Sequence, residues 1–231
     1  MNMENRKLLE RLKGKLIVSC QARVGWPMYG SEIMAAFAVA AQQGGAAGIR
    51  ATGVENIARI KEKVDLPIIG INKQFSDDYD VYITPTYQSA VDILEVGIEI
   101  IAIDATPRRR PGGERVEDIL RKIRENYPDV LVMGEISTLQ EAKDILPLGF
   151  DLISTTLSGY TKASQPRSSV DLELIAQIHT ITDTPIIAEG KIAHEEEAVA
   201  AIRAGAHAVV VGTSITRPEI ITERYVSALN G

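Results

Sequence analysis

Cysteine is almost absent from this 231-residue chain, in which Cys20 is the only one. A lone cysteine excludes an intrachain disulfide and is typical of a reducing compartment, so we expect a cytoplasmic protein. The N-terminal stretch 1–13 is charged and lacks the apolar segment of a secretory signal. No apolar run approaches the roughly 20 residues that a membrane-spanning helix needs, so no membrane partner is expected.

An excess of positive charge is also missing. The chain has 25 Lys and Arg against 31 Asp and Glu, a net charge of −6. Nucleic acid is therefore not expected as a partner, because no basic surplus is available to neutralise its phosphates. Hydrophobic residues make up 45% of the chain, which is enough for a large core in a globular protein.

Eight short, nearly continuous apolar runs are present, as is typical of parallel strands buried on both faces. They cover residues 16–20, 47–50, 67–72, 100–104, 131–135, 152–156, 185–189 and 208–212. Helical patterns alternate with them at 31–42, 54–64, 87–96, 116–127, from 137, and at 170–180, 195–204 and 218–229. A weaker ninth run, 81–84, belongs to the connection after the third strand.

These eight strand–helix units predict a single-domain α/β fold, a (β/α)8 TIM barrel over residues 1–231. Residues 1–13 are a candidate N-terminal helix that closes the bottom of the barrel. The alternative, an open doubly wound sheet, is less favoured because no G-x-G-x-x-G follows the first strand. We also expect Ser137 to cap the sixth helix, with Gln140 three residues later. Gly97, Gly149 and Gly205 should end helices in the left-handed conformation.

Polar residues stand where the apolar strands end, at the edge that carries the active site of such barrels. They are Gln21, Arg50, Lys73, Asp104, Glu135, Thr156 and Glu189. A partly desolvated Lys73 is a candidate base, and the alternative is a surface lysine. Glu189 is either its acid–base partner or an ion-pair partner of Lys73 or Lys191. Arg50 is either an anion clamp or a salt-bridge partner of a carboxylate.

Glycine-containing turns after the seventh and eighth strands indicate a phosphate site. Gly190 follows the seventh strand, and Gly212 and Thr213 follow the eighth, ahead of Arg217 and Pro218. Backbone N–H groups at such turns bind anions, and phosphate is commonly held there in this fold. Pro218 suits the first turn of a helix.

Several loop residues are weaker candidates. Trp26 and Tyr29 could line or cover the mouth of the barrel, and Tyr160 lies in a loop suited to hydrogen bonding a sugar. The run 108–110, three arginines, is either a solvated charge run or a contact for substrate or another subunit. The three histidines lack ligand spacing, so no metal site is expected.

Seven segments match one family pattern in order over nearly the whole chain. They are LIVSCQA at 16–22, GIRA at 48–51, PIIGINK at 67–73, IAIDAT at 101–106, TTLSGYT at 155–161, IIAEGKI at 186–192 and VVVGTSITRP at 209–218. The chain thereby resembles the N-acetylmannosamine-6-phosphate 2-epimerase family. The resemblance implies interconversion of N-acetylmannosamine 6-phosphate and N-acetylglucosamine 6-phosphate in amino-sugar and sialic acid catabolism, without metal or organic cofactor. It also implies a homodimer.

Residue roles follow from the same resemblance. It implies Lys73 and Glu189 as catalytic residues and Gln21 and Arg50 as substrate contacts. The phosphate positions that it implies are Gly190, Gly212, Thr213 and Arg217. By position rather than by resemblance, Asp104, Glu135 and Tyr160 are further substrate candidates at the mouth, and either carboxylate could instead be a structural group that orients Lys73. Two residues depart from the pattern: Glu135 replaces a usual Asp, and Thr213 replaces a frequent Gly.

Two other functions stay open at this point. Another phosphosugar barrel enzyme, such as an isomerase or aldolase, would use the same anion site with different chemistry. A non-catalytic phosphosugar sensor would keep Arg50 and the glycine turns without a base.

Overall fold

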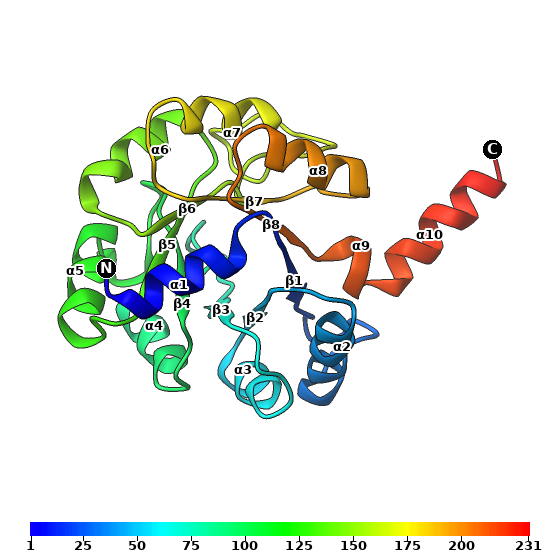
Figure 1. The fold of residues 1–231 in the computed structure, drawn as a ribbon, viewed down its shortest axis with the longest axis horizontal. Coiled ribbons are helices and arrows are strands. Elements are labelled where there is room, and N and C mark those ends of the chain that lie inside the picture. The colour runs from blue at the N-terminus through cyan, green and yellow to red at the C-terminus, as the bar shows by residue number, and fades with distance from the viewer.

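Eight parallel strands close into a barrel in chain order, as the computed structural model of residues 1–231 shows (Figure 1). The strands are β1 (Leu16–Cys20), β2 (Gly48–Thr52), β3 (Ile68–Ile71), β4 (Ile100–Asp104), β5 (Leu131–Glu135), β6 (Leu152–Ser154), β7 (Ile186–Glu189) and β8 (Ala208–Val211). Closure occurs where β8 pairs with β1, with Ile17 opposite Val210. The predicted TIM barrel is confirmed, and the open sheet is excluded.

Helices surround the barrel and cover its outer face (Figure 1). They are α2 (Ser31–Gln43), α3 (Val54–Lys61), α4 (Tyr87–Leu94), α5 (Val116–Asn126), α6 (Leu139–Ile145), α7 (Leu172–His179) and α8 (Glu195–Arg203). Short 3-10 turns lie at Pro111–Gly113 and Leu146–Leu148. Each strand is buried between the helices and the barrel interior. Most strand residues are therefore apolar on both faces of the sheet. None of the helices combines the length and apolar character needed to cross a membrane.

Helix α1 (Met3–Leu12) lies across the N-terminal end of the barrel (Figure 1). Its buried Leu8, Leu9 and Leu12 join the apolar cluster that fills the barrel interior. The ring Nε2 of His207 lies 2.7 Å from the Leu9 carbonyl oxygen, which ties the helix to the chain just before β8. The bottom of the barrel is therefore plugged, and the opposite end is left for a site.

The run 81–84 is held between the extensions of two strands. Thr84 N donates to Asn72 O (2.9 Å), and Asp104 N donates to Ile83 O (3.2 Å). Ile83 also forms an antiparallel bridge with Lys73. This segment, which the sequence placed in the connection after the third strand, therefore fixes the backbone of Lys73 against β4.

The start of α6 differs by one residue from the prediction. Thr138, not Ser137, is the N-cap: its hydroxyl accepts from Glu141 N, and Glu141 instead of Gln140 returns the bond. Ser137 donates its hydroxyl to the same Glu141 carboxylate (2.7 Å). The two neighbouring hydroxyls satisfy the same capping pattern by sequence, and the helix register decides between them.

Glycine ends three helical segments in the left-handed region, as predicted. Gly97 (φ 82°), Gly149 (φ 81°) and Gly205 (φ 111°) each precede a strand. Only glycine adopts these angles without a steric cost from Cβ.

Helices α9 (Thr213–Thr216) and α10 (Pro218–Leu229) follow the last strand. Pro218 occupies the first helical turn of α10 as expected. This helix extends away from the barrel (red in Figure 1) and buries none of its residues.

We predict that Leu12→Ala lowers the free energy of unfolding by about 2–5 kcal/mol, because it leaves a cavity under the plug. Met3→Ala, at an exposed position of the same helix, is the control and should change it by less than about 0.5 kcal/mol. Urea denaturation measures both. Equal stability of the two variants would contradict the role assigned to α1.

Candidate active site

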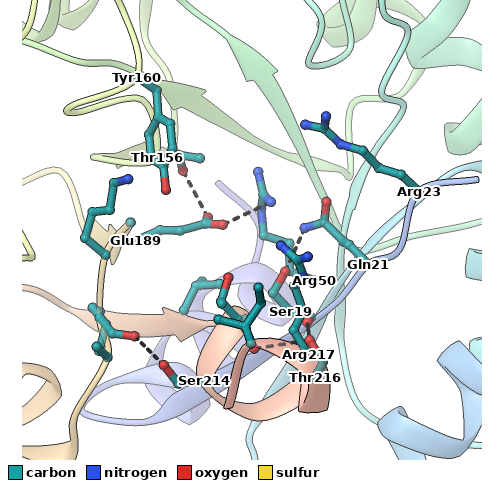
Figure 2. Close-up of a pocket in the computed structure, with 18 of the residues that line it drawn as sticks. Ser19, Gln21, Arg23, Arg50, Thr156, Tyr160, Glu189, Ser214, Thr216 and Arg217 are labelled. Atoms are coloured by element: carbon teal, nitrogen blue, oxygen red, sulfur yellow. Dashed lines mark hydrogen bonds and ion pairs between the residues drawn. The ribbon is translucent and has the colours of Figure 1, made fainter. Parts of the chain in front are cut away.

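A cavity of about 490 Å³ opens at the C-terminal ends of the strands (Figure 2). Its lining includes nine of the predicted site residues: Gln21, Arg50, Lys73, Tyr160, Glu189, Gly190, Gly212, Thr213 and Arg217. They come from the strands β1, β2, β3, β6, β7 and β8 or from the loops that follow. Arg50 is the middle residue of β2 (Gly48–Thr52) rather than its last residue as predicted. The closed barrel thus brings together residues that are up to about two hundred positions apart in sequence.

Arg50 lies at the base of the cavity between two carboxylates. The side chain is 1% exposed, it pairs with Glu135, and its Nη1 is 3.0 Å from Glu189 Oε1. The salt-bridge alternative for Arg50 is therefore what the structure contains. A buried guanidinium needs such partners, because an unpaired charge removed from water is very costly.

Glu135 is completely buried beneath Arg50. Burial raises its pKa to about 7, an effect that Arg50 opposes and the nearby Glu189 reinforces. Its second oxygen, Oε2, has no hydrogen-bond partner. Glu135 therefore is not part of the cavity lining, contrary to its predicted place at the mouth, and it pairs with Arg50, which is.

Lys73 lies on the cavity wall beside this cluster. Burial and the positive charge of Arg50 lower its pKa to about 8, although Glu189 and Glu135 act in the opposite direction. Its backbone N–H donates to Thr52 Oγ1 (3.2 Å), which adds to the bridge with Ile83. A lysine with this pKa is available as a neutral amine near neutral pH and can accept a proton.

Glu189 is held on both of its oxygens (Figure 2). Arg50 contacts Oε1, and the Thr156 hydroxyl donates to Oε2 (2.9 Å). The Thr156 hydroxyl oxygen in turn lies 2.7 Å from Ser154 Oγ. Glu189 therefore pairs with Arg50 rather than with Lys73 or Lys191. In the sequence, Thr156 is a strand-end residue with no evident role, and only the fold shows that it orients the carboxylate.

The two glycine turns also line the cavity. Gly190 is left-handed (φ 106°), and a Cβ on Gly212 would approach Ser19 Cβ to 3.1 Å. Side chains are therefore disfavoured at both turns. Arg217 lines the same cavity and supplies a positive charge to it.

Asp104 is not part of the cavity wall. It is completely buried, and its carboxylate accepts from the Thr106 amide (2.9 Å) and hydroxyl (2.6 Å) and pairs with Arg108. Arg110 is also buried, at 4% exposure, and donates to the Asp104 carbonyl. The prediction that Asp104 contacts substrate is thus corrected. Its oxygens are already bound by Thr106, Arg108 and Arg110 from the loop that follows. The arginine run is not a solvated face, since only Arg109 is exposed.

Some lining residues were missed or left undecided by the sequence. Trp26 lines the cavity, whereas Tyr29 does not. Further lining groups are Ser19, Arg23, Tyr82, Lys191 and Ser214. Lys191 Nζ lies 4.2 Å from the ring centroid of Tyr160, across the mouth. Their position at or after the C-terminal ends of strands was the available signal, but that signal does not give side-chain direction.

Known proteins match this chain over nearly its full length. The family model described as NanE, "Putative N-acetylmannosamine-6-phosphate epimerase", matches residues 34–231. The chain belongs to this epimerase family. A relative from Caldanaerobacter subterraneus, described as "Putative N-acetylmannosamine-6-phosphate 2-epimerase", is 49% identical over 220 residues, 95% of this chain and 93% of its own.

Two further comparisons agree with the family. A protein of the same description from Enterobacter sp. is 46% identical and covers 96% of this chain and 95% of its own. The solved N-acetylmannosamine-6-phosphate 2-epimerase from Clostridium perfringens superimposes with a TM-score of 0.92 at 47% identity, and covers 96% of each chain. The epimerase family and the barrel predicted from the sequence are both confirmed.

We predict that Lys73 titrates near pH 8 and that Glu189→Gln lowers its pKa further, because a negative charge that favours the protonated amine is lost. Glu10→Gln, an exposed change on α1 at the other end of the barrel, is the control. NMR of ¹³Cε-labelled lysine measures the titration, with Lys73→Arg to assign the signal. A value near the ordinary 10.4 would contradict the geometry described.

Proposed function

We propose that this epimerase-family chain interconverts N-acetylmannosamine 6-phosphate and N-acetylglucosamine 6-phosphate by removing and returning the proton at C2. The observation that carries the proposal is one cavity lined by Lys73, Glu189, Arg217 and the two glycine turns. This pattern supplies proton transfer and anion binding together. The named activities of its relatives support the same reaction.

The chemistry requires the open-chain sugar, since the C2 proton is acidic only when C1 is a carbonyl. Lys73, with a pKa of about 8, is the proposed base that takes this proton and leaves an enol-type intermediate. A proton then returns to the opposite face of C2. Glu189 is its acid–base partner, or the group that transfers a proton at the C1 oxygen.

Arg50 and Glu135 set the charge around these two groups. Arg50 favours the neutral form of Lys73, and the two carboxylates limit that effect. Gln21 is proposed as a substrate contact: its amide donates to Ser19 Oγ (2.7 Å), and its Oε1 has no partner within the protein. Tyr160, half exposed at the mouth, is a further proposed contact.

Phosphate is proposed to bind at Gly190, Gly212, Thr213 and Arg217. Binding energy from this remote group holds C2 close to the amine, so it contributes to the rate through orientation. A phosphorylated metabolite and a single, buried Cys20 also support a cytoplasmic location.

We predict that Lys73→Ala lowers epimerisation by about 10²–10⁴-fold or more, the usual contribution of a general base, while binding of the phosphosugar stays measurable. Proton NMR with N-acetylmannosamine 6-phosphate follows the reaction, and calorimetry follows binding. In deuterated solvent, the wild-type product should carry deuterium at C2. Lys63→Ala, on the surface, is the control.

Three outcomes separate the candidate functions. Turnover by Lys73→Ala near the wild-type rate would defeat its assignment as base. A product other than the C2 epimer would favour another phosphosugar isomerase or an aldolase. Binding by the wild type without any turnover would favour the sensor.

We also propose a homodimer in which a second copy packs against α10. This helix buries no residue, and Tyr225, Val226 and Leu229 are 72%, 50% and 86% exposed. After Arg217 this helix leaves the barrel, and the element that it mainly contacts is the short α9 (Figure 1). An exposed apolar helix face of this kind is typical of a protein–protein interface.

We predict that Val226→Glu with Leu229→Glu converts the dimer to a monomer, because two charges would be buried against the partner. Ser227→Glu, at an exposed position on the same helix, is the control and should stay dimeric. Sedimentation velocity gives the mass, and circular dichroism checks that the barrel is retained. A wild-type monomer, or a dimer that survives the double change, would contradict the proposal.

A further inference from the structure

Five side chains from three loops stack in a row along the cavity rim. The rings of Tyr82 and Phe75 are stacked, with centroids 5.0 Å apart. The Arg23 guanidinium carbon lies 4.3 Å from the Phe75 centroid and 5.5 Å from the Trp26 centroid. The Arg217 guanidinium carbon lies 3.7 Å from the Trp26 centroid. The row therefore links the loop after β3 to the segment after β8 through the loop after β1.

Trp26 and Arg217 form the shortest contact of this row. At 3.7 Å the guanidinium is stacked on the indole face, the geometry in which tryptophan attracts a cation most strongly. Trp26 also lines the cavity and is partly buried. Its ring face is thus occupied by Arg217, which leaves this face unavailable for stacking on a sugar.

Arg217 is held in a second direction by Glu219. Its Nε donates to Glu219 Oε1 (2.7 Å), while its two Nη groups make no hydrogen bond within the protein. The side chain is 25% exposed and lines the cavity near the two glycine turns. The ring face and the carboxylate together fix the guanidinium plane, and the free Nη pair matches the oxygens of a phosphate.

We propose that Trp26 is a positioning residue that holds Arg217 in the orientation that binds the phosphate of the substrate. An arginine whose rotamer is already fixed loses less conformational freedom when it binds an anion, so the stack increases affinity before any new contact is made. Trp26 thereby sets the preference for phosphorylated over unphosphorylated amino sugar. This inference rests on the proposed function for the identity of the substrate.

The first test compares Trp26→Leu with Trp26→Phe, which keeps an aromatic face, and with Tyr29→Leu, an exposed change in the same loop outside the cavity. A cation–π contact of this kind corresponds to a change of about 2- to 30-fold. We expect Trp26→Leu to raise KM for the phosphorylated sugar by that factor with kcat within about threefold. Trp26→Phe should recover most of the loss, and Tyr29→Leu should match wild type.

A double-mutant cycle separates positioning from a general loop defect. The Arg217→Gln variant lacks the guanidinium. Adding Trp26→Leu to it should therefore raise KM by less than about twofold relative to Arg217→Gln alone. If instead the KM increases of the two single variants multiply in the double variant, Trp26 does not act through Arg217 and the inference is overturned. A fall in kcat alone, with KM unchanged, would also overturn it.

Binding of inorganic phosphate tests the same contact without turnover. Trp26 is the only tryptophan, so its fluorescence reports on this position alone. Phosphate should change the emission of wild type and Tyr29→Leu but not of Arg217→Gln, and calorimetry should show weaker binding by Trp26→Leu.

Failure of this inference and of the proposed function can be told apart. Equal phosphate affinity of wild type and Trp26→Leu, or no phosphate binding by wild type, overturns the role of Trp26 even if epimerisation is observed. Weaker phosphate binding by Trp26→Leu supports that role even if the wild type yields no C2 epimer, a result that would defeat the proposed function alone.

Discussion

The buried guanidinium of Arg50, between Glu135 and Glu189, is the interaction on which the site depends. One cation contacts two carboxylates from β5 and β7, so it links strands on different sides of the barrel. Such a cluster is a weak source of stability, because its desolvation offsets much of its attraction. Its value lies in the charges that it places next to Lys73: burial and Arg50 lower the pKa of Lys73 to about 8, and the two carboxylates act in the opposite direction.

The surrounding fold keeps this cluster in a fixed geometry. Thr156, which is hydrogen-bonded to Ser154, holds the second oxygen of Glu189, and the segment 81–84 fixes the backbone of Lys73. Thr156 follows the end of β6, and the segment 81–84 is hydrogen-bonded between the chain after β3 and the end of β4. The Lys73 amine, which follows β3, and the Glu189 carboxylate, at the end of β7, therefore reach the same cavity, as proton transfer on a bound sugar requires.

The proposed phosphate site is built differently from the Arg50 cluster. Backbone turns at Gly190 and Gly212 need no charged side chain, and Arg217 supplies the charge from the segment that leads into α10. Since α10 leaves the barrel directly after Arg217, the proposed dimer contact and the proposed phosphate contact lie next to each other in sequence. Trp26 connects this segment to the body of the barrel.

The sequence by itself determined the barrel, its strand ends and the residue types at the mouth. Eight apolar runs separated by amphipathic stretches have few other ways to bury both faces, and left-handed glycines at Gly97, Gly149 and Gly205 mark the turns into strands. The seven matched segments together were sufficient for the family. The tertiary structure alone decided which groups pair: Glu189 with Arg50 and Thr156, Asp104 with its own loop, and Arg217 with Trp26. These choices depend on side-chain direction and reach within a few ångströms, which are set only when strands distant in sequence meet in the closed barrel.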